Sequence, residues 1–310
     1  IKIARPNIMT AVPRFYNNLF AKMQINLRNQ SQFKQNLFNQ TIKLGTKKLH
    51  LQRLTFKEKL LDFVLDKLVR KKVKNNFGGR LEAFVSGGGP LDSKVGESLN
   101  ALGLKTLQGY GLTETSPVVS CNPLHKIKVD TVGPIFPGVE VKLSEDGEIL
   151  VKGENLMLGY WNNTDATDQT IKNGWLYTGD IGEFDHEGYL KITDRKKDII
   201  VSLGGDNIAP SKLENLLTLS SDIEQACVFG EQKNYIAALI VLSFDSKATK
   251  EDIQSYIDGI NIDLTQPEKI KKFTFISEPF SIENNQMTPT MKVRRHEVQK
   301  KYSEIINQLF

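Results

Sequence analysis

Two short segments of this chain carry residue types that bind nucleotides. The first, Ser86-Gly87-Gly88-Gly89-Pro90, has no β-carbon at three successive positions, so its backbone can approach a flat ring or a phosphate closely. The second, Gly109-Tyr110-Gly111-Leu112-Thr113-Glu114, offers an aromatic face, a hydroxyl and a carboxylate. These groups suit a purine, a phosphate oxygen and a magnesium ion respectively. Taken alone, the glycine-rich segment is more often an ordinary turn.

Further along the chain, three charged features could complete a nucleotide site. Asp180 follows an expected strand at 175–177, where a carboxylate can accept both hydroxyls of a ribose. The run 194–198 holds four further charged residues besides Asp194, and Lys292 stands on a proline-stiffened loop before a basic helix. Each feature also has an ordinary interpretation: a turn aspartate, a solvated charge run, and the start of a helix with surface cations.

The elements expected around the two loops form an α/β pattern. Strands are predicted at 81–85 and 105–108, each running into one of the loops, with a helix between them at 92–102. Ligands bind at the carboxyl ends of strands in parallel α/β sheets, so this order favours a common site. Residues 130–193 are predicted to be β-rich, and Asp146-Gly147 has the composition of a hairpin turn.

A domain boundary is expected near Asp194. It separates a domain of residues 1–193 from a C-terminal α+β domain of residues 194–310, in which strands and helices alternate again. The predicted strands are 199–202, 225–229, 236–242 and 273–276, and the predicted helices are 210–219 and 249–256.

The first eighty residues are predicted to contain two amphipathic helices and are strongly basic, with 18 Lys and Arg against three Asp and Glu. One helix starts after Pro13 and the other ends at Gly78-Gly79. The second is interpreted as a capped surface helix, with a membrane-surface helix as the alternative. The apolar stripes are Phe15, Leu19, Met23 and Leu27 in the first helix, and Phe56, Leu60, Leu61, Val64, Leu65 and Leu68 in the second.

Composition narrows the class of protein. The 310 residues are 39% hydrophobic and 25% charged with a net charge of +5, which excludes disordered and collagen-like chains. Neither an apolar run of about 20 residues nor a signal peptide is visible. Cys121 and Cys227 have no partnering spacing, so a reducing cytoplasm is expected. Because the first residue is Ile1, we expect the chain to be part of a longer polypeptide.

Six motifs, in this order, resemble the acyl-adenylate-forming (AMP-binding) superfamily, and within it the long-chain fatty-acid CoA ligases. The resemblance implies an α/β fold: the second half of the large N-terminal domain, with α/β layers and a β-rich subdomain, followed by a small, mobile α+β domain. The motifs are Gln108-Gly-Tyr-Gly-Leu-Thr-Glu-Thr-Ser-Pro117, Gly153-Glu-Asn-Leu-Met-Leu-Gly-Tyr-Trp161, Gly174-Trp-Leu-Tyr-Thr-Gly-Asp180, Asp194-Arg-Lys-Lys-Asp198, Gly204-Gly-Asp-Asn-Ile-Ala-Pro210 and Thr288-Pro-Thr-Met-Lys292.

The same resemblance implies roles for individual residues in the first domain. Tyr110 would stack on adenine, Thr113 would contact the α-phosphate, and Glu114 would bind Mg²⁺. Asp180 would hold the ribose hydroxyls. The backbone around the adenine would come from Gly87, Gly88, Gly89, Pro90, Gly109 and Gly111.

In the C-terminal domain, the resemblance implies that Lys292 bridges the fatty carboxylate and the α-phosphate as acyl-AMP forms. Arg195 would help Asp180 at the ribose, and Asp194 would be the hinge between the domains. Gly205 would line the tunnel for the pantetheine of CoA. One departure is that positions 87 to 89 are all glycine, where relatives often carry alanine.

The function implied by the resemblance is ATP-dependent activation of a long-chain fatty acid through acyl-AMP to acyl-CoA, with release of AMP and pyrophosphate. The alternatives are another carboxylate-activating ligase, for aryl, medium-chain or carrier-protein substrates, and a non-catalytic module that binds lipid surfaces. The Ser/Thr/Gly-rich phosphate loop of the superfamily is not found, so the N-terminal half of the enzyme is expected to be missing and the chain to be poorly active alone.

The basic N-terminal segment narrows the expected partners. Residues 1–80 are expected to contact an anionic membrane or the missing half, and no nucleic acid is expected because no reader motif is present. The protein is expected to be cytoplasmic or peripheral to the inner face of the membrane.

Overall fold

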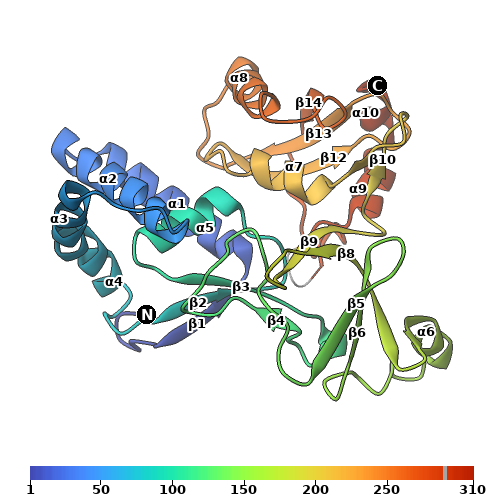
Figure 1. Ribbon diagram of the computed structural model, residues 1–310. Helices are drawn as coiled ribbons and strands as arrows, with labels where there is room; N and C mark the ends of the chain where they lie inside the picture. The colour runs from blue at the N-terminus through green and yellow to red at the C-terminus, as the bar shows by residue number, and fades with distance from the viewer. Residues whose placement is uncertain (289–291) are drawn as a thin grey trace. The chain divides into compact units, whose positions relative to one another are not determined.

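The computed structural model describes residues 1–288 and 292–310, without the side chain of Asp194. The chain forms two compact units, Ile1–Thr193 and Asp194–Phe310. Figure 1 traces the first unit from blue to yellow and the second from yellow to red.

The first unit is built on a sheet of four strands in the order β1-β2-β3-β4. β1, β2 and β3 run parallel, and their register aligns Ala11 with Ser86 and Ser86 with Gln108. The carboxyl ends of these three strands therefore lie side by side, as the α/β pattern predicts. β4 pairs antiparallel with β3 beyond this point. The strands are β1 (Ile8–Ala11), β2 (Ala83–Ser86), β3 (Thr106–Tyr110) and β4 (Ser120–Cys121).

Helices lie together on one side of this sheet (Figure 1). Pro13 opens α1, as predicted, because a proline at the first helical position loses no hydrogen bond. Asp92 caps α5 by accepting from the backbone N–H of Val95. α2 was not predicted. The helices are α1 (Pro13–Arg28), α2 (Gln32–Leu49) and α5 (Ser93–Ala101).

The single helix predicted to end at Gly78-Gly79 has three parts: α3 (Phe56–Leu65), a π-helical turn η1 (Asp66–Arg70) and α4 (Lys71–Asn75). A capping box between Thr55 and Glu58 starts α3. The predicted apolar stripe of this helix is mostly exposed to solvent. Leu65 is buried, whereas the other members of the stripe are exposed.

The rest of the first unit is a five-stranded sheet in which β5-β6-β8-β7 are neighbours and β9 pairs with β8. The Asp146-Gly147 turn joins β5 to β6 as predicted, with Gly147 at a φ of 79°. The elements are β5 (Val139–Leu143), β6 (Glu148–Gly153), α6 (Thr164–Thr170), β7 (Ile171–Lys172), β8 (Trp175–Phe184) and β9 (Leu190–Arg195), preceded by a 3₁₀ turn η2 (Thr113–Thr115).

The second unit has a three-stranded sheet, β12-β13-β14, covered on both faces. Alternate residues of the strands face opposite sides: Val228 packs in one core with Leu213 of α7, and Cys227 packs in the other with Val298 of α9. The elements are β10 (Ile200–Val201), β11 (Asn207–Ile208), α7 (Pro210–Leu217), β12 (Ile223–Phe229), β13 (Ile236–Leu242), α8 (Lys250–Asn261), β14 (Ile270–Phe275), α9 (Arg295–Lys301) and α10 (Ser303–Gln308).

The expected mixed α/β fold is confirmed. Within the described ranges, every helix is too short or too polar to cross a bilayer.

Candidate nucleotide site

The glycine-rich loop leaves the end of β2 and lies beside the neighbouring strand ends. The backbone N–H of Gly87 donates to the carbonyl of Ala11 at 3.3 Å. Gly88 has a φ of 83°, where a side chain would strain the backbone. A β-carbon at Gly87 or Gly89 would meet its nearest atom at 3.9 or 3.7 Å, an ordinary contact. Alanine would therefore fit at either flanking position, and Gly88 is the position that requires glycine.

Gln108 fixes this loop to β3. Its side chain is buried, accepts from the backbone N–H of Leu91 at 3.1 Å, and donates to the carbonyl of Val129. A buried amide with both ends satisfied holds its neighbours in one arrangement. The residue lies inside the Gln108–Pro117 motif, but its anchoring role was not predicted.

Tyr110 and Asp180 meet across 70 positions of sequence. The Tyr110 hydroxyl donates to Asp180 Oδ2 at 2.7 Å, which places the aromatic ring and the carboxylate beside each other. Asp180 is buried and Tyr110 is half-buried. Two of the groups predicted to hold a nucleoside thus come from β3 and β8 and form one cluster.

The prediction that Asp180 follows a strand was wrong, because it lies within β8 at a β-bulge. Leu150 pairs with Tyr177, but Glu148 pairs with Ile181, so β8 carries extra residues between the two pairs. Gly179 absorbs the irregularity with a φ of 71°. A bulge re-aims the side chains of a strand, and here it accompanies the contact of Asp180 with Tyr110.

Hydrogen bonds hold the bulge in shape. The Thr178 hydroxyl donates to the carbonyl of Ile149 at 2.8 Å and accepts from the N–H of Asp180 at 3.1 Å. The N–H of Gly179 donates to Glu148 Oε1 at 2.9 Å. The Thr-Gly-Asp sequence therefore supplies a hydroxyl, a left-handed turn and a carboxylate to one local structure.

Glu114 is held by a residue that the sequence analysis assigned no role. The Tyr160 hydroxyl donates to Glu114 Oε1 at 2.9 Å, and the N–H of Met157 donates to the Glu114 carbonyl at 2.9 Å. Burial raises the pKa of Tyr160, and the bond to Glu114 raises that pKa further. Thr113, on the same 3₁₀ turn, is exposed. The Gly153–Trp161 motif thus supports the loop that carries Glu114. Tyr160 lies within this motif, and that position is the signal in the sequence that could have identified it.

The glycines of the second loop allow close packing. A β-carbon at Gly111 would lie 1.6 Å from the Pro117 carbonyl oxygen, so no other residue fits there. At Gly109 the nearest atom would be the Ser120 carbonyl oxygen at 3.3 Å. Both glycines therefore fold the segment back against the 117–120 backbone.

Lys292 lies in the second unit, next to an antiparallel bridge. The N–H of Thr288 donates to the Lys292 carbonyl at 2.8 Å, and the N–H of Lys292 donates to the Thr288 hydroxyl at 3.0 Å. Met287 and Val293 form this bridge. The lysine side chain is exposed. The middle of the predicted motif, residues 289–291, lies outside the described residues.

A partly buried ion pair between Arg295 and Glu214 connects the segment after Lys292 to α7 of the second unit. Arg295 donates to Glu214 on α7, and its Nε donates to the Val228 carbonyl at 3.1 Å. Glu214 also accepts from the N–H of Val228 at 3.0 Å. Burial raises the pKa of the Glu214 carboxyl, and the Arg295 charge opposes that rise. The sequence analysis missed both residues, because pairing across 81 positions leaves no local signal.

The remaining predicted residues occupy the start of the second unit. Arg195 is the last residue of β9, and Asp194, whose backbone precedes it there, has a side chain outside the described part. Gly205 occupies the turn between β10 and β11 with a φ of 86°. Ser202 and Asp206 close that turn with a side-chain hydrogen bond of 3.0 Å.

Glu114 offers one carboxylate, which suits a metal ion that is also bound by the phosphates of a nucleotide. Among the residues that the structure describes, no group of three or more His, Cys, Asp or Glu side chains is placed to hold a metal ion. Mg²⁺ commonly takes one or two carboxylates and completes its shell with water and substrate phosphates. The half-buried Glu114 carboxylate can supply one such ligand.

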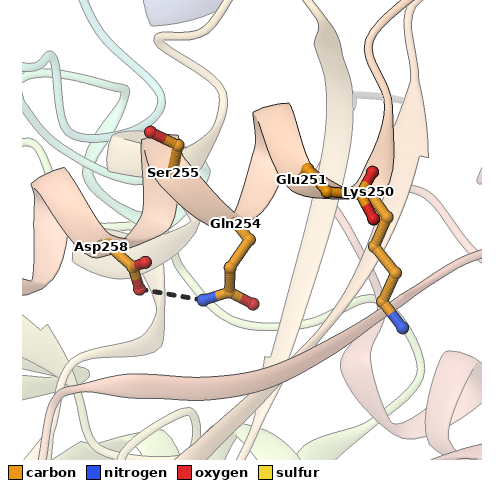
Figure 2. Close-up of a pocket in the computed structure, with 5 residues that line it drawn as sticks. All are labelled: Lys250, Glu251, Gln254, Ser255 and Asp258. Atoms are coloured by element: carbon orange, nitrogen blue, oxygen red, sulfur yellow. Dashed lines mark hydrogen bonds between the residues drawn. The ribbon is translucent and has the colours of Figure 1, made fainter.

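A hollow of about 420 Å³ lies along α8 and contains none of the predicted site residues. Figure 2 shows its lining side chains, among which Gln254 Nε2 donates to Asp258 Oδ1 at 2.9 Å. All five lining residues come from this one helix, namely Lys250, Glu251, Gln254, Ser255 and Asp258. We assign it no role in nucleotide binding.

Family models match both parts of the chain. Residues 1–161 match the AMP-binding enzyme family, and residues 197–310 match the AMP-binding enzyme C-terminal domain. The long-chain-fatty-acid–CoA ligase FadD15 of Mycobacterium tuberculosis is 37% identical over 80% of this chain and 45% of its own length. Long chain acyl-CoA synthetase 6, peroxisomal, of Arabidopsis thaliana is 32% identical over 99% of this chain and 48% of its own length. The chain spans about half the length of the curated relatives it matches.

Solved structures share the fold. The adenylation domain of a carboxylate reductase from Mycobacterium chelonae is similar with a TM-score of 0.75 and 21% identity, over 100% of this chain and 47% of that one. The A-PCP didomain of the carboxylic acid reductase from Segniliparus rugosus, in complex with AMP, gives a TM-score of 0.70 and 20% identity, over 99% of this chain and 42% of that one.

Proposed function

The chain belongs to the AMP-binding enzyme family, and on that premise we propose that it is the C-terminal part of an AMP-forming long-chain fatty-acid CoA ligase. The observation that carries the proposal is the hydrogen bond that joins Tyr110, at the end of β3, to Asp180, at the β-bulge of β8. The long-chain class is supported by the names of the relatives, at 37% and 32% identity. ATP, CoA and a long-chain fatty acid are the proposed substrates.

The proposed nucleoside site uses the two loops and the bulge. The ring of Tyr110 stacks on adenine, while the backbone of 87–90 and of Gly109 and Gly111 lies at its edge. Asp180 accepts the ribose hydroxyls, helped by Arg195. The bond from the Tyr110 hydroxyl fixes both partners before a ligand arrives, so less entropy is lost on binding.

In the first proposed step, a carboxylate oxygen of the fatty acid attacks the α-phosphorus of ATP. The bond from that phosphorus to the bridging oxygen breaks, and pyrophosphate leaves. Two like charges about 4 Å apart repel by about 4 kcal/mol at an effective dielectric near 20. Lys292, placed between carboxylate and α-phosphate, offsets this repulsion, and Thr113 contacts the same phosphate. Mg²⁺, when bound at Glu114, supplies further positive charge to the phosphates.

In the second proposed step, the sulfur of CoA attacks the acyl carbon, loses its proton and displaces AMP. Lys292 is then no longer needed, and a different face of residues 194–310 admits the pantetheine past Gly205. We propose that the chain pivots at Asp194, the first residue of the second compact unit. Placing the lysine on a separate unit allows it to serve one step and withdraw for the other.

The proposal includes two partners outside this chain. A phosphate-binding half completes the enzyme, a suggestion supported by the coverage of only about half of each relative. Residues 1–80, with 18 basic and three acidic side chains, contact an anionic membrane from which fatty acids are taken.

ATP–pyrophosphate exchange by the full-length protein tests the function. We expect exchange with palmitate to exceed exchange with octanoate and benzoate, and Lys292→Ala to abolish it. Lys269→Ala, which removes a lysine elsewhere in the second unit, is the matched control. A maximum with benzoate would replace the long-chain assignment with an aryl ligase, and wild-type exchange by Lys292→Ala would refute the catalytic scheme.

A further inference from the structure

The helical segment α3-η1-α4 turns its charged pair inward and its apolar residues outward. Asp62 and Arg70 are buried and lie 2.7 Å apart, and Arg70 Nε also donates to the Ala101 carbonyl at 2.8 Å. Exposure is 84% at Phe56, 62% at Leu60 and 59% at Phe63. An apolar face exposed while charges are buried is the reverse of an ordinary surface helix, and such a face marks an interaction site.

The π-helical turn keeps this face continuous with a row of lysines. Leu65 and Arg70 both point inward although they are five positions apart, the spacing of a π-turn. The extra residue in the turn leaves Lys67, Leu68 and Lys71 on the outer side with Phe63. Lys67 Nζ lies 4.5 Å from the centre of the Phe63 ring. The exposed residues on this side of the segment form a surface that we call the outer face of α3. They are Phe56, Leu60, Phe63, Val64, Lys67, Leu68, Lys71 and Lys72.

The charge on this face is positive because its acidic neighbours are engaged. Glu58 contacts Lys47 at 2.6 Å and accepts from the Thr55 backbone, which lowers the pKa of Glu58 to about 2. Asp62 is paired with Arg70 and Lys48. These residues and Asp66 are the three acidic residues among the first eighty. Asp66 is exposed and lies 3.7 Å from Arg70. The three lysines at positions 67, 71 and 72 therefore leave a net positive charge beside the exposed apolar side chains.

We propose that the outer face of α3 docks on an anionic lipid bilayer. Phenylalanine and leucine side chains would enter the boundary between headgroups and acyl chains, and Lys67, Lys71 and Lys72 would meet lipid phosphates. Charge complementarity favours this occupant, because lysines lie beside the exposed apolar side chains and lipid phosphates carry the opposite charge. The proposal rests on the proposed function, since a fatty-acid ligase gains by docking where its substrate is dissolved, and it names the surface that makes contact.

Vesicle sedimentation of the full-length protein, which includes the proposed phosphate-binding half, tests the surface. We expect binding to vesicles of phosphatidylcholine and phosphatidylglycerol in equal parts, little binding to phosphatidylcholine alone, and release by high salt. The double variant Leu60→Gln/Phe63→Gln should bind about tenfold more weakly, since both apolar side chains leave the membrane. The double variant Lys67→Glu/Lys71→Glu should also bind vesicles about tenfold more weakly, because it places negative charges beside the lipid phosphates.

Phe244→Gln is the matched control, because Phe244 is a fully exposed phenylalanine in the other unit. It should bind vesicles as the parent chain does. Unchanged binding by both double variants, or equal binding to uncharged vesicles, would overturn the proposal. The parent protein could instead form a dimer and not bind vesicles. If Leu60→Gln/Phe63→Gln then converted this dimer to a monomer, the outer face of α3 would be assigned to contact with a second copy of the chain. AMP affinity, measured in parallel, reports separately on the proposed function.

Discussion

The segments that carry the proposed site residues are held by different kinds of contact in the two units. In the first unit, Tyr110 and Tyr160 each donate a single neutral hydrogen bond to a carboxylate, Asp180 or Glu114. In the second unit, the segment that follows Lys292 is anchored by the partly buried ion pair of Arg295 and Glu214. Removal of a tyrosine hydroxyl leaves no unpaired cation or anion created by the change, whereas removal of Arg295 leaves the Glu214 carboxylate without its counter-charge. We therefore expect changes in the first unit to alter binding, and changes in the second to alter stability.

The largest effect is expected from Arg295→Leu. It leaves the partly buried Glu214 carboxylate without its partner, which costs about 3 kcal/mol, the lower end of the range for breaking a buried ion pair. Differential scanning calorimetry should show a lower melting temperature for the second unit and little change for the first. Lys301→Ala, which removes an exposed pair with Glu278, should change neither transition measurably. If Arg295→Leu melted like the parent chain, the contrast between the units would fail.

Asp180→Asn should weaken AMP binding without unfolding the chain. The amide keeps the size of the side chain but loses the negative charge that we propose accepts the ribose hydroxyls. A hydrogen bond to a charged group is worth about 1.5–3 kcal/mol, so affinity should fall about 10- to 100-fold in isothermal titration calorimetry. Asp185→Asn, in the loop between β8 and β9, should retain the parent affinity. Equal affinities for Asp180→Asn and the parent chain would place the ribose elsewhere.

Tyr160→Phe should have a smaller effect, on the Mg²⁺ requirement. Without the hydroxyl, Glu114 loses a donor that orients its carboxylate. One hydrogen bond contributes about 0.5–1.5 kcal/mol, so the Mg²⁺ concentration for half-maximal pyrophosphate exchange should rise about 2- to 12-fold. Tyr177→Phe, on β8, is the control. An unchanged Mg²⁺ profile would make the contact structural only.

The smallest expected effect is on the response to acid. Lys128 lowers the pKa of Asp185 to about 2, and Lys126 and Lys128 lower the pKa of Glu187 to about 2. Carboxyls with a lowered folded-state pKa contribute stability above their unfolded pKa near 4 and lose it as the pH falls toward 2. The melting temperature of the first unit should therefore fall between about pH 5 and about pH 2, and it should fall more steeply in the parent chain than in Asp185→Asn/Glu187→Gln.

Glu214 should respond to pH with the opposite sign. Burial raises its pKa in the folded state, so its contribution decreases as the pH rises through that raised pKa. Calorimetry over the same pH series measures both units at once. Parallel pH profiles for the two transitions would contradict the distinction between carboxyls with a lowered pKa and a carboxyl with a raised pKa.

Much of the fold followed from local signals. Pro13, Asp92 and the Asp146-Gly147 turn predicted the starts of α1 and α5 and the β5–β6 hairpin, because caps and turns depend on neighbouring residues. Strand β13 was predicted with its observed limits from an unbroken apolar run. The helix across residues 56–75 was predicted as an element without its π-turn, and whether its apolar stripe is covered was left open between two interpretations, since periodicity shows that a helix has two faces without showing which one is covered.

The features of the candidate site also fall into those specified by local sequence and those that depend on tertiary packing. The sequence by itself determined the glycine turns, the order of the motifs and the family, because these depend on residue types at short spacing. Only the tertiary structure decided that Tyr110 meets Asp180, that Tyr160 holds Glu114 and that Arg295 pairs with Glu214. These contacts join residues 70, 46 and 81 positions apart. Such pairs form when separate strands and helices pack, and no local preference of either residue specifies its partner.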